Sequence, residues 1–372
     1  MLFYCRRKRH TGAIPISAWC KERRTVSFTS VFWNKYKERM LKTRQKYKTS
    51  LQRGGIGNIA FILTSRCNFS CKHCLRNFDS GFDLPFEIAQ KVIVSAKKFN
   101  YSNICLTGGE PLLYPRLRDL VDLITGNDLW FSVVSNGYIF KKHLDLFKEH
   151  KNKMRFIAFS LESIDKDKHD SQRMKGSFDV LMENFQICRE AKIPFRVVTA
   201  ASLMNYDEIF DIALLAKKKG AQCLSMTTIL PCPRSEKNNL VLSMAQREEL
   251  HASLEELSRI LKFPILISAD IKACPGVRLC NAVSMTDISV DMNGNLVLCC
   301  ELSNYDNEQI RDSAVVTSLK DRSFDQALKC LSERLHKFNC KRIEDHIKEP
   351  DPASIDFNSC FYCLRPQGLG HA

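Results

Sequence analysis

Three cysteines stand at C-x3-C-x2-C spacing in this chain, as Cys67, Cys71 and Cys74, directly after the apolar run 59–63. Three thiolates packed this closely can all reach one metal centre. A tetrahedral zinc site takes four ligands, and no fourth cysteine completes the set here. A four-iron cluster held by three thiolates leaves one iron open to a small molecule. The spacing therefore indicates an iron–sulfur centre, with a zinc knuckle or a chance pattern as the alternatives.

The sequence Thr-Gly-Gly-Glu-Pro at 107–111 follows about 35 residues later, after a second apolar run. Together the two motifs resemble those of the radical S-adenosylmethionine (SAM) enzymes, in which the residue before the third cysteine is usually aromatic; here it is His73. The resemblance implies that the three cysteines hold a [4Fe–4S] cluster whose free iron chelates SAM. One-electron reduction then releases a 5′-deoxyadenosyl radical, which abstracts a hydrogen atom from a substrate.

The resemblance also implies SAM contacts at the ends of the predicted strands. Gly108 and Gly109 lack a Cβ atom, so that backbone can approach a ligand there, and in the family this segment binds the methionyl ammonium group. Glu110 is the natural acceptor for that charge, and Pro111 fixes the exit from the strand. A turn or a helix cap is the structural alternative for these residues and for the further candidates. Those candidates are Ser135, Asn136, Ser160 and Glu162 for the ribose and carboxylate of SAM, and backbone near His73 and Thr228 for its adenine.

Apolar runs alternate with amphipathic segments from Asn58 onward. Such an alternation predicts a parallel α/β sheet but does not distinguish an open doubly wound sheet from a curved barrel. The resemblance implies a (β/α)6 partial TIM barrel, with the active groups at the carboxyl ends of the strands. The predicted strands are 58–64, 103–107, 130–135, 155–161, 194–200 and 222–229, and the predicted helices are 85–99, 115–126, 141–150, 176–191 and 206–219.

The pattern changes after the barrel. A helix at 243–261 and a strand at 264–268 lead out of it, and the segment 287–300 alternates around Asn293-Gly294, a strong hairpin signal. A helix is predicted at 323–337. We therefore divide the chain into a basic N-terminal extension, a radical SAM core and a small α+β iron–sulfur module, at 1–54, 55–270 and 271–372.

Four cysteines of the C-terminal module could bind a second metal centre. A hairpin brings its base close to its entry loop, so that Cys280 and Cys299 can lie together, and Cys360 and Cys363 have the commonest iron–sulfur spacing. The spacing of Cys280, Gly294 and Cys299 resembles the opening of the SPASM domain, an auxiliary-cluster module of many radical SAM enzymes.

The resemblance to the SPASM domain is incomplete, because no cysteine follows Cys363. The shortened "twitch" form with one auxiliary [4Fe–4S] cluster is therefore expected. Zinc remains an alternative for these cysteines, and Cys274 and Cys300 could replace Cys280 and Cys299.

Charge and cysteine content limit the partners and the compartment. The first 53 residues carry 15 Lys or Arg and two acids, and so hold +13 of the net charge of +15; the rest of the chain is not expected to bind nucleic acid. Seventeen cysteines cannot all pair, and neither an apolar signal-peptide core nor a membrane-spanning run is visible. We therefore expect a reducing, cytoplasmic location.

The basic N-terminal extension suggests alternatives to a cytoplasmic location. Apolar residues fall at helical spacing within it and are interleaved with cations, at Phe28, Val31, Phe32, Tyr36 and Met40. Such a helix could lie on an anionic membrane or direct the chain to mitochondria. It could equally dock on the barrel, or reflect a start codon placed too far upstream.

The resemblance implies an enzyme that cleaves SAM reductively and abstracts hydrogen from an unactivated C–H bond. The auxiliary cluster would bind substrate or accept an electron, which suits oxidation or cross-linking of a peptide or of a small molecule. A flavodoxin- or ferredoxin-type protein would supply the electron. The alternative is an iron–sulfur scaffold or electron carrier without SAM turnover, against which the intact motif at 108–110 argues. The sequence identifies no residue that quenches the product radical.

Overall fold

The computed structural model describes residues 57–76, 81–268, 271, 280–303, 305–348 and 359–364. All of them belong to one compact unit, Ile56–Ala372. The predicted extension 1–54, with its amphipathic helix, and Cys274 lie outside the described residues. Within the described part, no helix combines the length and the apolar character needed to cross a membrane.

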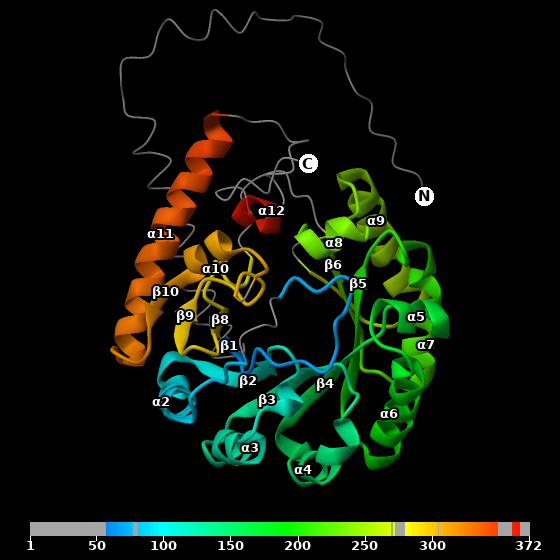
Figure 1. Ribbon diagram of the computed structural model, residues 1–372, viewed down its shortest axis with the longest axis horizontal. Helices are drawn as coiled ribbons and strands as arrows, with labels where there is room; N and C mark the ends of the chain where they lie inside the picture. Colours follow the sequence, from blue (N-terminus) through cyan, green and yellow to red (C-terminus); the bar gives the residue numbers. More distant parts are fainter. Residues whose placement is uncertain are drawn as a thin grey trace, which may run out of the picture. The chain divides into compact units, whose positions relative to one another are not determined.

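Six parallel strands follow one another in sequence order across the centre of the sheet, as the alternating pattern predicts. Each lies within two residues of its predicted bounds, and Figure 1 shows them side by side with helices outside them. This is the partial barrel of the predicted fold class. The strands are β1 (Gly57–Ile62), β2 (Tyr101–Thr107), β3 (Trp130–Ser135), β4 (Met154–Ser160), β5 (Phe195–Ala201) and β6 (Leu224–Thr228).

The connecting helices bury apolar faces against this sheet. Alternate strand residues such as Phe61 and Phe131 are fully buried and meet helix residues such as Val92 and Leu120 in one core. The predicted helices are confirmed, the last of them ending at Gly220, whose φ of 91° suits glycine. They are α2 (Phe86–Ala96), α3 (Leu117–Gly126), α4 (Leu144–Glu149), α6 (Ser177–Ala191) and α7 (Ile209–Lys219), extended by 3-10 turns at Lys97–Phe99, Phe140–His143 and Tyr206–Glu208.

One helix between β4 and β5 was not predicted. Helix α5 (Lys166–Gln172) has little apolar periodicity, and its clearest sequence signal is Asp165, whose side chain accepts a 2.8 Å hydrogen bond from the Lys168 amide as an N-cap. Helix α5 ends directly before Arg173, which lies in the functional site.

The C-terminal module continues the barrel sheet. Strand β8 (Asp287–Val290) pairs in parallel with β1 and forms the predicted hairpin with β9 (Asn295–Val297), whose turn at Gly294 has a φ of 83°. With β10 (Val315–Ser318) at one edge and β7 (Ile265–Ile267) at the other, the sheet has ten strands. The remaining helices are α8 (Pro233–Lys237), α9 (Met244–Leu261), α10 (Glu308–Ala314), α11 (Phe324–Lys348) and α12 (Ser359–Leu364). The predicted division at 270/271 stays a prediction.

Candidate functional site

The cysteine loop leaves the carboxyl end of β1, where Cys71 is buried and Cys67 and Cys74 are half-buried. Burial raises the pKa of the Cys67 thiol to about 12 and that of Cys74 to about 11, and it also raises the pKa of Cys71. The charge of each neighbouring thiolate raises the pKa of Cys67 further. Three thiols with pKa values raised in this way are stable as thiolates only beside a strongly cationic centre. Their chemistry therefore fits the predicted iron–sulfur cluster.

The two glycines after β2 pack against the backbone of the cysteine loop. A Cβ atom at Gly108 would lie 2.6 Å from the carbonyl oxygen of Thr64, and one at Gly109 would lie 2.2 Å from that of Arg66. The Gly109 amide donates to Thr64 at 2.7 Å, and the Glu110 amide donates to Arg66 at 2.8 Å. The sequence suggests close approach to a ligand as the reason for these glycines; the structure shows that the close approach is to the chain itself. Contact of this segment with SAM stays a prediction.

Glu110 is a buried carboxylate at the centre of a hydrogen-bonded group. It accepts hydrogen bonds from the Ser135 hydroxyl and the Asn136 amide, both at 2.8 Å, and from the Leu112 amide at 3.1 Å. Burial nevertheless raises the pKa of Glu110 to about 7. A ligand cation would stabilise its charged form. Pro111 follows it and begins a 3-10 turn, which agrees with the predicted exit from the strand.

Asn136 ties the end of β3 to the cysteine loop. Its Nδ2 donates to Asn68 Oδ1 at 2.8 Å and lies 4.0 Å from Cys67 Sγ. Ser135 and Asn136 therefore position Glu110 and the loop, whatever contact they make with a ligand. Ser160 is half-buried at the end of β4, and its assignment to SAM stays a prediction.

Glu162, in the loop after β4, lies close to His73, which directly precedes the third cysteine of the triad. Its Oε1 accepts a 2.7 Å hydrogen bond from Arg173 and lies 3.7 Å from His73 Nε2, and its Oε2 accepts from the Ala200 amide at 3.0 Å. Burial opposes the charge of Glu162, but His73 and Arg173 outweigh it and lower its pKa. Burial lowers the pKa of His73. Arg173, at 2.7 Å against 3.7 Å for His73, is the closer partner of Glu162.

Arg173 is a functional candidate that the sequence analysis missed. Its side chain is 8% exposed, and its charge partly offsets the burial that raises the pKa of the Cys71 thiol. Its guanidinium carbon lies 5.8 Å from the centre of the Phe69 ring, inside the cysteine loop. Its buried Nε donates no hydrogen bond to any residue in the described part of the chain. The N-cap signal at Asp165 could have located the helix that delivers it.

The four predicted auxiliary cysteines come together. Cys280, Cys299, Cys360 and Cys363 line one cavity of about 150 Å³, whose other walls include Leu230, Leu302 and Phe338. Burial, and then the charge of Cys280, raise the pKa of Cys363 to about 12. Cys300 contacts Cys299 but does not line the cavity. The geometry therefore favours Cys299 over the Cys300 alternative.

Backbone pairing joins the two sets of cysteines. The Asp306 amide donates to the Leu75 carbonyl at 2.8 Å, and Arg76 pairs with Tyr305 across an antiparallel bridge. Tyr305 is fully buried and packs in a small apolar cluster that also contains Leu230, Leu302 and Phe361, with Leu75, Cys299, Cys360 and Cys363 at its border.

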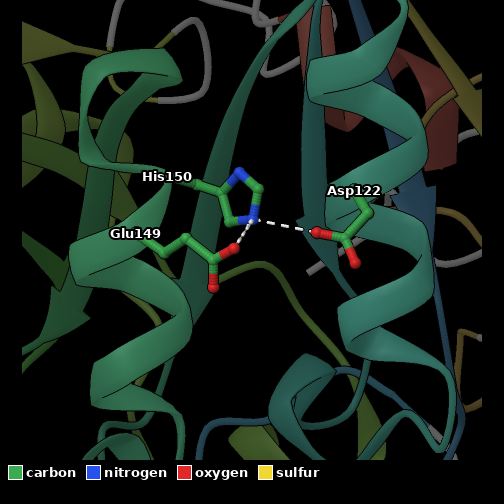
Figure 2. Close-up of side chains that lie close together, drawn as sticks. All are labelled: Asp122, Glu149 and His150. Carbon is green, nitrogen blue, oxygen red and sulfur yellow. Dashed lines mark ion pairs between the residues drawn. The ribbon is translucent and has the colours of Figure 1, made fainter.

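A further group of metal-ligand types lies on the outer helices α3 and α4, as Figure 2 shows. His150 Nε2 lies 2.9 Å from Asp122 and 3.7 Å from Glu149, and the two carboxylates are about half exposed. Glu149 also accepts a 2.9 Å hydrogen bond from Arg118. Surface ion pairs explain this group without a bound ion.

The fold and the site together define a class of protein: an α/β partial barrel with a three-cysteine loop at the carboxyl end of its first strand. Residues 61–216 match the family model described as "Radical SAM superfamily". Residues 61–216 are therefore similar to the radical SAM domain, as the two motifs predict.

Curated relatives cover only part of the chain. The AdoMet-dependent heme synthase of Methanosarcina barkeri is 26% identical over 52% of this chain and 56% of its own length. The subtilosin biosynthesis protein AlbA of Bacillus subtilis is 29% identical over 44% of this chain and 38% of its own length. The chain thus spans about half or less of these two relatives.

Solved structures show the same fold. Native anSMEcpe with bound AdoMet and Cp18Cys peptide matches with a TM-score of 0.59 and 16% identity, over 75% of this chain and 81% of that one. SuiB of Streptococcus suis bound to its precursor peptide SuiA matches with a TM-score of 0.56 and 12% identity, over 72% of this chain and 65% of that one.

Proposed function

We propose that this protein is a radical SAM enzyme that abstracts hydrogen from a C–H bond of a peptide substrate. The observation that carries the proposal is the meeting of three unlike groups at the barrel mouth. These are the three-cysteine loop, the buried carboxylate of Glu110 and the buried guanidinium of Arg173. SAM presents an amino group and a carboxylate together, which suit the Glu110 carboxylate and the Nε of Arg173, unpaired among the described residues.

The chain's own residues would bind and orient the cofactor. Cys67, Cys71 and Cys74 would hold the cluster, which when bound supplies the electron that cleaves SAM. Glu110 would accept hydrogen bonds from the ammonium group, since a cation offsets the burial that raises its pKa to about 7. Arg173 would use its buried Nε for the carboxylate of SAM, while Nη1 remains on Glu162.

We also propose one auxiliary iron–sulfur cluster on the four C-terminal cysteines. The cavity that they line, about 150 Å³, is roughly ten times the 10–15 Å³ that a cavity needs to hold one water molecule. A single zinc ion bound by four thiolates would leave such a space unfilled, because each Zn–S bond is only about 2.3 Å long. This supports a cluster over zinc.

A peptide is the substrate class that the relatives favour. AlbA is named for bacteriocin biosynthesis, and the two solved structures carry bound peptides. A small-molecule substrate is the second candidate, because other relatives are named as a nucleotide dehydratase and a GTP cyclase. We further propose a flavodoxin- or ferredoxin-type electron donor and a cytoplasmic location. The alternatives, which depend on the basic extension, are peripheral membrane contact and mitochondrial targeting.

The test is 5′-deoxyadenosine release from SAM by the full chain after anaerobic reconstitution and dithionite reduction. We expect release that is abolished in the Cys67→Ala/Cys71→Ala/Cys74→Ala variant and kept in Cys330→Ala, which removes a half-buried cysteine outside both sets. No release from protein with an intact cluster, with or without candidate peptides, would favour the scaffold alternative.

A further inference from the structure

An apolar groove lies on the outside of the barrel between α7 and α9, which Figure 1 shows on the same side of the molecule beyond β5 and β6. Its volume is about 390 Å³. Buried Ile209, Leu250 and Leu257 are among its lining residues. Three large apolar side chains on its edges are open to solvent, namely Tyr206, Phe210 and Ile260, at 38%, 49% and 64% exposure. Exposed apolar side chains gathered in one groove are typical of an interaction site.

The edges of this groove are acidic. Asp207, Glu249 and Glu256 line it, and the ten lining residues include no Lys or Arg. None of the three carboxylates forms an ion pair with another residue in the described ranges. On α9, Glu249 and Glu256 lie two helical turns apart and Ile260 follows one turn later, so they share one face of the helix. The groove therefore complements a segment that carries both cations and apolar side chains.

The groove begins beside the catalytic mouth. Tyr206 directly follows Asn205, whose Nδ2 donates a 2.7 Å hydrogen bond to the carbonyl oxygen of Glu162. In the same turn, Glu208 accepts hydrogen bonds from Ser163 and Lys168. A polypeptide bound along α7 and α9 would thus have one end next to the loop that holds Glu162.

We infer that this groove binds a cationic, amphipathic segment of the polypeptide substrate, outside the residue that is modified. The inference rests on the proposed function for the identity of the occupant, and on the apolar floor and unpaired carboxylates for its chemistry. From Glu249 to Ile260 the helix face spans roughly 16 Å, enough for a helical segment of about 11 residues. Anionic lipid is a poor occupant, because the same carboxylates repel it.

The experiment measures binding of a fluorescein-labelled peptide of about 14 residues, with Leu at helical i, i+3, i+4 and i+7 positions and Lys elsewhere. Anisotropy is recorded with the full reconstituted chain, without SAM or reductant. We expect saturable binding that falls about tenfold or more in the Phe210→Asn/Glu256→Lys variant, since an anchor is lost and a charge reversed. The matched control, Val94→Asn/Glu333→Lys, changes an equally exposed apolar side chain and an exposed acid on other helices, and should bind as the unsubstituted chain does.

Two results would overturn the inference: equal binding by the groove variant and the control, or equal binding of a peptide with Glu in place of every Lys. The circular dichroism spectra of both variants, expected to match the unsubstituted chain, exclude misfolding as the cause of a loss. Failure of the proposed function is a separate result, because 5′-deoxyadenosine release is measured on the unsubstituted chain. Release without peptide binding refutes the groove alone; binding without release refutes the radical chemistry alone.

Discussion

The Cα of Gly109 faces the carbonyl oxygen of Arg66 so closely that a Cβ atom would lie 2.2 Å from it. This approach joins the end of β2 to the cysteine loop. The geometry of the three cysteines therefore depends on a glycine that follows a different strand.

Gly109→Ala should displace the cysteine loop and so reduce cluster assembly. Relieving a clash with backbone costs about 1–3 kcal/mol in a packed site. We expect iron and sulfide per chain to fall after reconstitution, measured by colorimetric assay. Gly126→Ala at the end of α3 is the control, because a Cβ atom there would meet nothing beyond its own helix within 4 Å. Full iron content in Gly109→Ala would show that the contact is dispensable.

Glu110→Gln should weaken SAM binding with little effect on iron content. The oxygen of Gln can still accept from the Leu112 amide and the Ser135 hydroxyl, but its amino group cannot accept from the Asn136 amide, and the charge is lost. Together these losses are worth about 10- to 100-fold in affinity. Equilibrium dialysis of SAM against the reconstituted protein measures it. Unchanged affinity would remove Glu110 from the binding site.

The unsubstituted protein should bind SAM more weakly as the pH falls below the Glu110 pKa of about 7. Burial raises this pKa, so the ligand-free carboxylate takes up a proton below that value, and the cation of SAM must displace it. Affinity should drop by up to about tenfold per pH unit below the pKa. The Glu110→Gln variant is the control, in which this part of the pH dependence is absent.

Arg173→Met should destabilise the barrel, because it leaves Glu162 buried without its closest partner. Loss of one member of a buried ion pair typically costs about 3–5 kcal/mol. The Arg173→Met/Glu162→Gln double variant should recover part of the melting temperature but not SAM affinity. Thermal unfolding checks the first statement and dialysis the second. Arg118→Met, which removes an exposed ion pair with Glu149, is the control and should melt as the unsubstituted chain does.

Cys299→Ser should lower the iron content from about eight to about four atoms per chain, whereas Cys300→Ser should leave it near eight. Only Cys299 of this adjacent pair lines the cavity of the auxiliary site. Iron and zinc are measured together by mass spectrometry. Stoichiometric zinc in the unsubstituted chain, with four irons, would instead support the zinc alternative.

The parts of this molecule that can be predicted from the sequence are those marked by a pattern of neighbouring residues. The cysteine triad and the six strands follow from spacing and from apolar runs, and the four auxiliary cysteines from a hairpin and a C-x2-C spacing. Arg173 was missed because it follows a helix with no apolar periodicity. The packing of Gly108 and Gly109 against the cysteine loop was not predicted either, since the backbone that they contact lies more than 40 residues earlier and only the folded chain brings it near. The parallel pairing of β1 with β8 joins segments about 230 residues apart, which no local pattern encodes.

That pairing constrains how such an enzyme can be recombined. Strand β1 is an interior strand, held by β2 on one side and by Asp287–Val290 on the other. A shortened chain that stopped after β7 would present β1 as a bare edge, with unsatisfied amides and carbonyls that invite another chain to pair. The C-terminal cysteines therefore cannot be exchanged as a structurally independent module. A donor module must bring a strand in register with 58–61 before it can bring a cluster.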